Sequence, residues 1–83
     1  MISNAFSRLQ AALELEDTLK FSGLSDNFGK IREKVKDKAG KELYLLRYAK
    51  GNIEVYSNRF IKVNGVKMKS VREAQQFLQL ELT

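Results

Sequence analysis

The stretch KIREKVKDKAGKELYLLRYA, residues 30–49, decides how the middle of this chain folds. Its first nine residues carry a cation at every second position: Lys30, Arg32, Lys34, Lys36 and Lys38. In a β-strand this alternation places all five cations on one face, because successive side chains point to opposite sides of a sheet. A strand here therefore predicts a basic ladder.

A helix is the competing interpretation of the same segment. Four apolar residues are spaced as one face of a helix would be: Leu24, Phe28, Ile31 and Val35. In a helix the cations would scatter around the axis. Gly29 would lie inside that helix, however, and DKAG at 37–40 is a turn signal that leads directly into ELYLLRYA. We therefore favour a strand over a helix for residues 30–36.

Turn signals recur at short intervals after this point. AKGN at 49–52 suits a hairpin turn, and Asn64-Gly65 is the strongest short hairpin signal in the chain. ELYLLRYA is apolar on both faces and is the expected central strand. Ser57-Asn58 is either a tight turn or a bulge within one long strand. The pattern predicts an antiparallel β-meander of three to five strands.

The segment before the meander has the periodicity of a helix over residues 3–20. Its apolar residues form two stripes: Phe6, Leu9 and Leu13 in the first, and Leu15 and Leu19 in a narrower second. A helix that is apolar on more than one side is expected to pack broadly on a sheet, so we expect these residues to belong to the core. Gly23 is placed where a left-handed residue would end the helix.

A second helix is predicted after the meander, in KSVREAQQFLQLEL. Ser70 and Glu73 form a capping box, in which each side chain is expected to accept a hydrogen bond from the backbone N–H of the other residue. Its expected core face consists of Val71, Ala74, Phe77 and Leu78. The chain is thus predicted to be one α+β domain over residues 1–83 (αβββα-like), with both helices packed on one sheet face.

The order αβββα and the start of the last helix resemble double-stranded RNA-binding domains, in which lysines at this helix start contact phosphates. Ser70, Arg72 and Ala74 occupy that place in this chain. Val71 and Gln75 stand where that family has further lysines, and its loop of glycine, proline and histidine is missing. We do not assign the chain to this family.

Charge is unevenly distributed along the 83 residues, whose net charge is +5. Residues 1–28 carry two basic and four acidic side chains, a net charge of −2, whereas residues 29–83 carry thirteen and six, a net charge of +7. This asymmetry indicates a polyanionic partner or serves solubility. The sequence has no cysteine and no long apolar run, so we expect a cytoplasmic protein without a membrane segment.

Catalysis is not expected, because the chain has neither histidine nor cysteine to act as a base or nucleophile near neutral pH. Glu14, Glu16 and Asp17 could be imagined as a cation site, but an acidic helix face is usually only solvated. We predict no cofactor, no metal and no small-molecule substrate.

The favoured function is nucleic-acid binding through a basic sheet face. The predicted phosphate contacts are Lys30, Arg32, Lys34, Lys36, Lys38, Arg47, Lys50, Arg59 and Lys62, with Lys67 and Lys69 as further cations. The predicted stacking residues are Tyr48 and Tyr56, with Tyr44 and Phe60 as further aromatic candidates.

Two other interpretations remain open. The aromatic residues could belong to the core, and lysines on an edge strand can simply prevent sheets from pairing edge to edge. The alternative function is that of a protein-binding adaptor or regulator, including the accessory type that phages encode, or a homodimer.

Overall fold

A computed structural model describes residues 4–23 and 32–80 of the chain. The elements in chain order are α1 (Asn4–Ser22), β1 (Arg32–Lys36), β2 (Glu42–Tyr48), β3 (Gly51–Ser57), β4 (Phe60–Val63), β5 (Val66–Met68) and α2 (Val71–Leu80). This arrangement confirms the α+β prediction of a helix, an antiparallel meander and a second helix.

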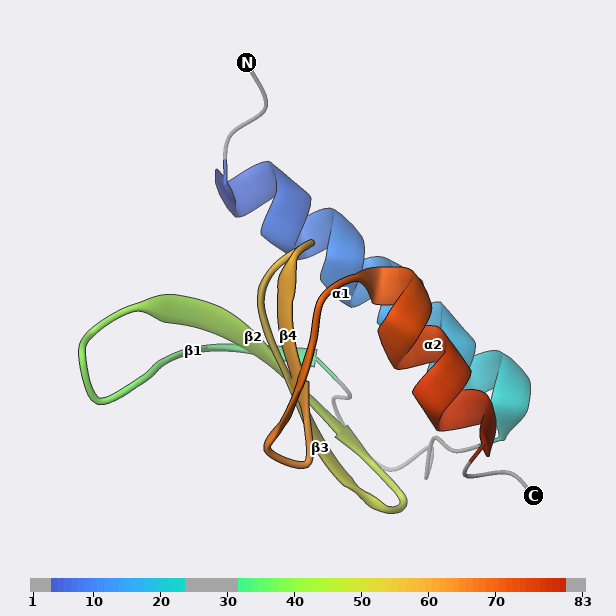
Figure 1. The fold of residues 1–83 in the computed structure, drawn as a ribbon. Coiled ribbons are helices and arrows are strands. Elements are labelled where there is room, and N and C mark those ends of the chain that lie inside the picture. The colour runs from blue at the N-terminus through green and yellow to red at the C-terminus, as the bar shows by residue number, and fades with distance from the viewer. Residues whose placement is uncertain (1–3, 24–31, 81–83) are drawn as a thin grey trace.

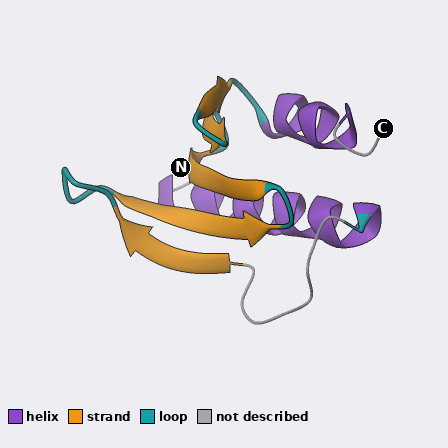
Figure 2. Cartoon of the chain, turned by 90° about the horizontal axis from the view of Figure 1, so that it is seen from below, coloured by secondary structure: helices purple, strands orange, loops and turns teal. Residues whose placement is uncertain are grey.

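The five strands form one antiparallel sheet in the order β1-β2-β3-β4-β5. Both helices lie on the same side of this sheet, with α2 beside the C-terminal half of α1 (Figure 1). Seen from below, part of the sheet lies in front of α1 (Figure 2). We call the sheet surface that α1 and α2 do not cover the open face.

Residues 32–36 form a strand, so the helix interpretation of this segment is wrong. Asp37 Oδ1 accepts hydrogen bonds from the backbone N–H groups of Ala39 and Lys41, which fixes the turn after β1. Gly40 ends this turn with a φ of 81°, a conformation that favours glycine. The β1–β2 hairpin projects beyond the helices (Figure 1). Lys30 and Ile31 lie outside the described residues.

The other hairpins follow the predicted turn residues. Asn64 and Gly65 have φ values of 51° and 83°, as expected for an Asn-Gly hairpin turn. Ser57 pairs with Phe60 across a tight turn, and the register shifts between Val55 and Ser57. Ser57-Asn58 is therefore part of a tight turn between two strands, and the alternative of a bulge within one long strand is wrong.

The core lies between the sheet and the helices. Its sheet side consists of Leu46, Tyr48, Ile53, Val55, Ile61, Val63 and Met68, and its helix side of Ala11, Ala12, Leu15, Leu19, Ala74 and Leu78. Arg8 joins α1 to the sheet, because its Nε donates a hydrogen bond of 3.1 Å to the backbone carbonyl of Tyr56.

The expected broad packing of α1 on the sheet is found for only one of its two apolar stripes, the narrower one. Leu15 and Leu19 are fully buried, whereas Phe6 is 54% and Leu13 is 39% exposed. Ala11 and Ala12 lie on the buried side, and their small side chains let the helix approach the sheet closely. The shorter stripe is therefore the core stripe.

The helix termini use the predicted residues with one difference. Gly23, with a φ of 73°, follows the end of α1. At the start of α2, Ser70 Oγ accepts a hydrogen bond from Glu73 N–H (3.1 Å). Glu73 Oε2 accepts its hydrogen bond from Lys69 N–H (3.1 Å) instead of the Ser70 N–H that we expected.

Of the two helices that the described residues form, neither has the length and apolar character needed to cross a membrane.

Candidate nucleic-acid interface

The basic ladder of β1 faces the helix side of the sheet. Arg32 pairs with Leu46 and Lys34 with Tyr44, and residues paired directly across an antiparallel ladder point to the same face. Leu46 is part of the core beneath the helices. Arg32, Lys34 and Lys36 therefore line the edge of the covered face, while Lys38 lies in the following turn.

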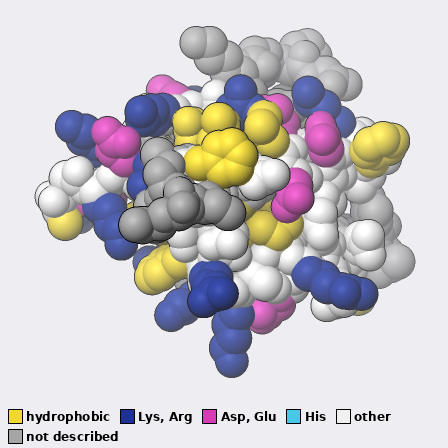
Figure 3. Space-filling view, turned by 90° about the horizontal axis from the view of Figure 1, so that it is seen from above, with side chains coloured by type: hydrophobic (Ala, Val, Ile, Leu, Met, Phe, Trp, Pro, Cys, Tyr) yellow, Lys and Arg dark blue, Asp and Glu magenta, His cyan; other side chains and the backbone are white. Residues whose placement is uncertain are grey.

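Carboxylates partly neutralise this ladder. Arg32 Nη1 lies 3.2 Å from Glu16 Oε1 of α1, and Lys34 Nζ lies 3.6 Å from Glu42 Oε2 of β2. Acidic and basic side chains are interspersed over the surface seen from above, the side on which α1 lies (Figure 3). Such an arrangement suits an edge strand that is protected against pairing with other sheets.

The remaining predicted cations do not join the ladder. Arg47 and Lys62 lie on the open face, and Arg47 Nη2 is 3.2 Å from Glu33 Oε2. Lys50 and Arg59 are exposed in the β2–β3 and β3–β4 turns. Lys30 lies outside the described residues, and the other eight cations predicted as one surface occupy both faces of the sheet and its turns.

Tyr48 is wrongly predicted as a stacking residue. It is only 5% exposed, belongs to the core, and its hydroxyl accepts a hydrogen bond from Asn64 Nδ2 (3.0 Å). Tyr44 also packs against this core. Tyr56 differs, because it lies on the open face, half-buried beside Phe60.

Tyr56 and Phe60 form the centre of a cluster on the open face. Their ring centroids are 5.0 Å apart and the ring planes are tilted by 59°. Three lysine Nζ atoms lie over the Phe60 ring, at 4.9 Å for Lys67, 5.7 Å for Lys62 and 5.9 Å for Lys41. We call Lys41, Tyr56, Phe60, Lys62 and Lys67 the Phe60 cluster.

Sheet register explains how residues far apart in sequence form this cluster. Tyr44 pairs with Val55, so Leu43 and Tyr56, the next residues in each direction, face each other on the open side. Lys62 pairs directly with Lys67 of β5. Leu43 is only 2% exposed although it points away from α1 and α2, which gives the cluster an apolar base.

The Tyr56 side chain is also held by Asp37 in the β1–β2 turn. A hydrogen bond from Lys41 N–H lowers the pKa of Asp37, with further lowering from Ala39 N–H, the Tyr56 side chain and the Lys41 charge. Burial raises the pKa of Tyr56, as do the charges of Glu54 and Asp37. Tyr56 thus stays a neutral phenol at neutral pH, and its hydroxyl donates a hydrogen bond to the Asp37 carboxylate.

The lysines of the Phe60 cluster differ from Arg32 and Lys34 of β1 in their charge partners. Lys41, Lys62 and Lys67 form no ion pair with any residue that the structure describes. Lys62 lies directly opposite Lys67 on one side, a like-charge pair that destabilises a sheet, and opposite Glu54 on the other side, an opposite-charge pair that offsets it. The cluster is therefore the place where positive charge and aromatic surface coincide.

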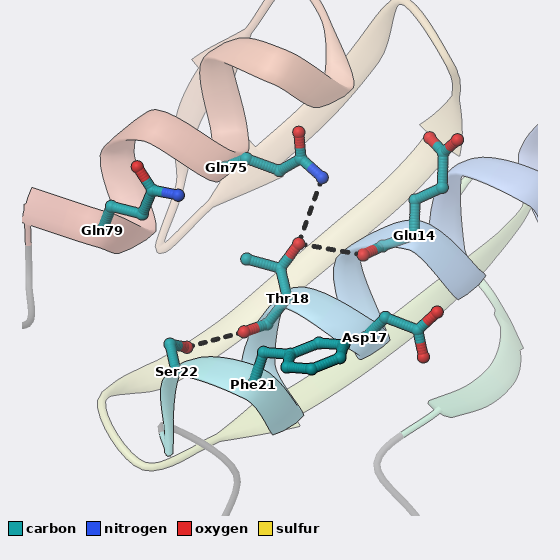
Figure 4. A pocket seen from close by; sticks show the side chains of 7 residues that line it. All are labelled: Glu14, Asp17, Thr18, Phe21, Ser22, Gln75 and Gln79. Carbon is teal, nitrogen blue, oxygen red and sulfur yellow. Dashed lines mark hydrogen bonds between the residues drawn. The ribbon is translucent and has the colours of Figure 1, made fainter.

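A separate groove of about 680 Å³ lies between the two helices (Figure 4). Its lining residues are Glu14, Asp17, Thr18, Phe21, Ser22, Gln75 and Gln79. Gln75 Nε2 donates to Thr18 Oγ1 (3.1 Å), and Thr18 Oγ1 donates to the Glu14 carbonyl (2.9 Å), so these groups join α2 to α1. Within residues 4–23 and 32–80, no group of three potential metal ligands comes together.

Sequence reasoning named Tyr56, Phe60, Lys62 and Lys67 but missed Lys41. The signal that could have found Lys41 is the period-two pattern that continues backward from β2, because Lys41, Leu43 and Leu45 fall on one face. Comparison of the chain with models of protein families, with curated proteins and with solved structures found no match. The function is therefore inferred from the residues and their geometry alone.

Proposed function

We propose that this protein binds nucleic acid through the Phe60 cluster on its open sheet face. The observation that carries the proposal is the gathering of three lysines without ion-pair partners among the described residues around a half-buried aromatic pair. Lysines supply phosphate contacts, and aromatic rings supply surfaces on which bases stack.

The role inferred is binding without catalysis, since the chain has no histidine or cysteine. A cytoplasmic location, where nucleic acids are abundant, is part of this proposal. The β1 ladder is given a different role, the protection of the sheet edge, because Arg32 and Lys34 already have carboxylate partners.

Two double variants with the same change in net charge test which surface binds. We expect Lys62→Glu with Lys67→Glu to abolish binding of a labelled oligonucleotide in a fluorescence anisotropy titration at low salt. Lys34→Glu with Lys36→Glu should weaken it only slightly, through the long-range loss of positive charge. Equal losses of oligonucleotide affinity in the two double variants would contradict the assignment of binding to the Phe60 cluster.

Salt dependence provides a second readout of the same contacts. If three lysines neutralise three phosphates, raising salt from about 50 to about 200 mM should weaken binding by roughly 20- to 40-fold. The slope of log affinity against log salt should fall by about one for each lysine removed. A wild-type protein that binds no oligonucleotide at low salt would remove the proposal.

A second candidate is self-association through the outward side of α1. Three large apolar side chains of α1 are exposed, Phe6 at 54%, Leu13 at 39% and Phe21 at 94%, and an apolar patch on one surface is typical of an interface. Light scattering should then give the mass of a dimer for the wild type and of a monomer for Leu13→Glu with Phe21→Glu. A wild-type monomer at every concentration would rule this candidate out.

A further inference from the structure

We propose that the ligand of the Phe60 cluster is a single strand, one of whose unpaired bases stacks on the Phe60 ring. The proposal rests on the nucleic-acid-binding function proposed above and narrows it to one class of ligand. It assigns Phe60 to the base, Lys41, Lys62 and Lys67 to the neighbouring phosphates, and Tyr56 to the support of Phe60.

The relation of the two rings leads to this assignment. Because the ring planes are tilted by 59°, Tyr56 does not stack flat on Phe60. The Phe60 faces are instead approached by ammonium groups, of which the Lys67 Nζ is closest at 4.9 Å from the centroid. Tyr56 also interacts with Asp37 of the β1–β2 turn, and its ring packs beside the Phe60 ring as a neighbour.

The lysines over Phe60 can give way to a base. Lys41 and Lys67 are exposed side chains on flexible stems, so their ammonium groups can leave the ring without disturbing the sheet. An exposed contact between an ammonium and a ring is weaker than the stacking of a base on an aromatic side chain. Once displaced, the same ammonium groups remain near the ring and can pair with the phosphates of the stacked nucleotide.

The positions of the cations also fit a strand that crosses the sheet. Lys41 comes directly before β2, Phe60 and Lys62 belong to β4, and Lys67 belongs to β5. The cations therefore lie on both sides of Phe60 along the β2-β3-β4-β5 direction. Three strand spacings correspond to about 14 Å, which accommodates only a few nucleotides.

A duplex cannot use this site in the same way. Its bases are paired and stacked on one another, so their faces are not available to Phe60, and only its phosphates could reach the lysines. The chemistry of an aromatic platform ringed by lysines therefore selects unpaired bases over a double helix.

The test compares four probes on the wild-type protein: a single strand of about 12 nucleotides, the corresponding duplex, an abasic strand of the same length and inorganic polyphosphate. We expect the single strand to bind roughly 5- to 150-fold more tightly than the abasic strand, the range given by one base stacked on an aromatic ring. The Phe60 ring protons should shift upfield when the single strand binds. Equal binding of the single strand and the abasic strand would overturn the proposal.

Two variants separate stacking from charge. Phe60→Leu keeps an apolar side chain and should lose the preference for bases while keeping its affinity for the abasic strand. Lys67→Gln should weaken the binding of the single strand and of the abasic strand by a similar factor. A Phe60→Leu protein that is folded by circular dichroism and keeps the full preference would overturn the assignment. If no probe binds the wild type, the nucleic-acid function itself fails.

Discussion

Substitution of Gly51 is predicted to lower the free energy of unfolding more than substitution of any other turn residue. Gly51 lies at the start of β3 with a φ of 146°, a backbone conformation that L-residues rarely adopt. A Cβ placed there would overlap the Asn64 side chain. The Gly51→Ala variant must therefore strain its backbone and displace Asn64.

Asn64 cannot move without loss, because it connects two hairpin turns. Its Oδ1 accepts from Asn52 N–H (2.9 Å), and its Nδ2 donates to the hydroxyl of Tyr48 (3.0 Å) and the carbonyl of Lys50 (3.3 Å). Backbone strain of about 1 to 3 kcal/mol and the loss of partly exposed hydrogen bonds give a total cost of about 2 to 5 kcal/mol. That is a large part of the roughly 4 to 12 kcal/mol expected for a domain of this size.

Urea denaturation followed by circular dichroism measures this cost, and two controls isolate its origin. Gly40→Ala also places a Cβ at positive φ, but into open space, so it should show the strain alone. In an Asn64→Gly background, Gly51→Ala should lose the part of its cost that comes from the overlap. If Gly51→Ala costs no more than Gly40→Ala, and the same in both backgrounds, the reasoning is refuted.

Three further predictions concern the helices and the β1–β2 turn. Leu15→Ala should lower the free energy of unfolding by about 2 to 5 kcal/mol, and Leu13→Ala by less than about 1 kcal/mol, because only Leu15 is fully buried; similar urea midpoints would contradict the core assignment. Ser70→Ala should cost about 1 kcal/mol through loss of the α2 cap, and an unchanged melting temperature would argue against that role. Since the pKa of Asp37 is lowered in the folded state, its contribution to stability is present above its ordinary pKa of 3.8 and is lost as the pH falls through the lowered value. The Asp37 carboxyl should therefore titrate below 3.8 by NMR, and titration at or above that value would show that the turn does not hold the carboxylate.

Turns and caps are the parts of this fold that the sequence predicts well. Asn64 and Gly65 can adopt positive φ at low cost, and Ser70 with Glu73 satisfies free backbone groups, so each determines its local structure with few tertiary contacts. The turn at Asp37 also predicts the β1 strand, because a helix over residues 30–36 could not pass through this turn directly into β2.

The choice of buried faces depends on tertiary packing and was less predictable. α1 carries apolar residues on two sides, and the buried side is the one where Ala11 and Ala12 allow close approach to the sheet. The β1 alternation predicts that its cations share a face, but which face depends on the register with Leu46 and Tyr44. The Phe60 cluster depends on register across four strands, so Lys41 could not be joined to Lys67 by spacing alone.

The most direct test of the proposed function is an NMR titration of the labelled protein with a short single-stranded oligonucleotide. We predict that the largest chemical-shift changes fall on Lys41, Tyr56, Phe60, Lys62 and Lys67, and that residues 32–36 change little. Changes centred on residues 32–36, or no changes at low salt, would contradict the assignment of nucleic-acid binding to the open face.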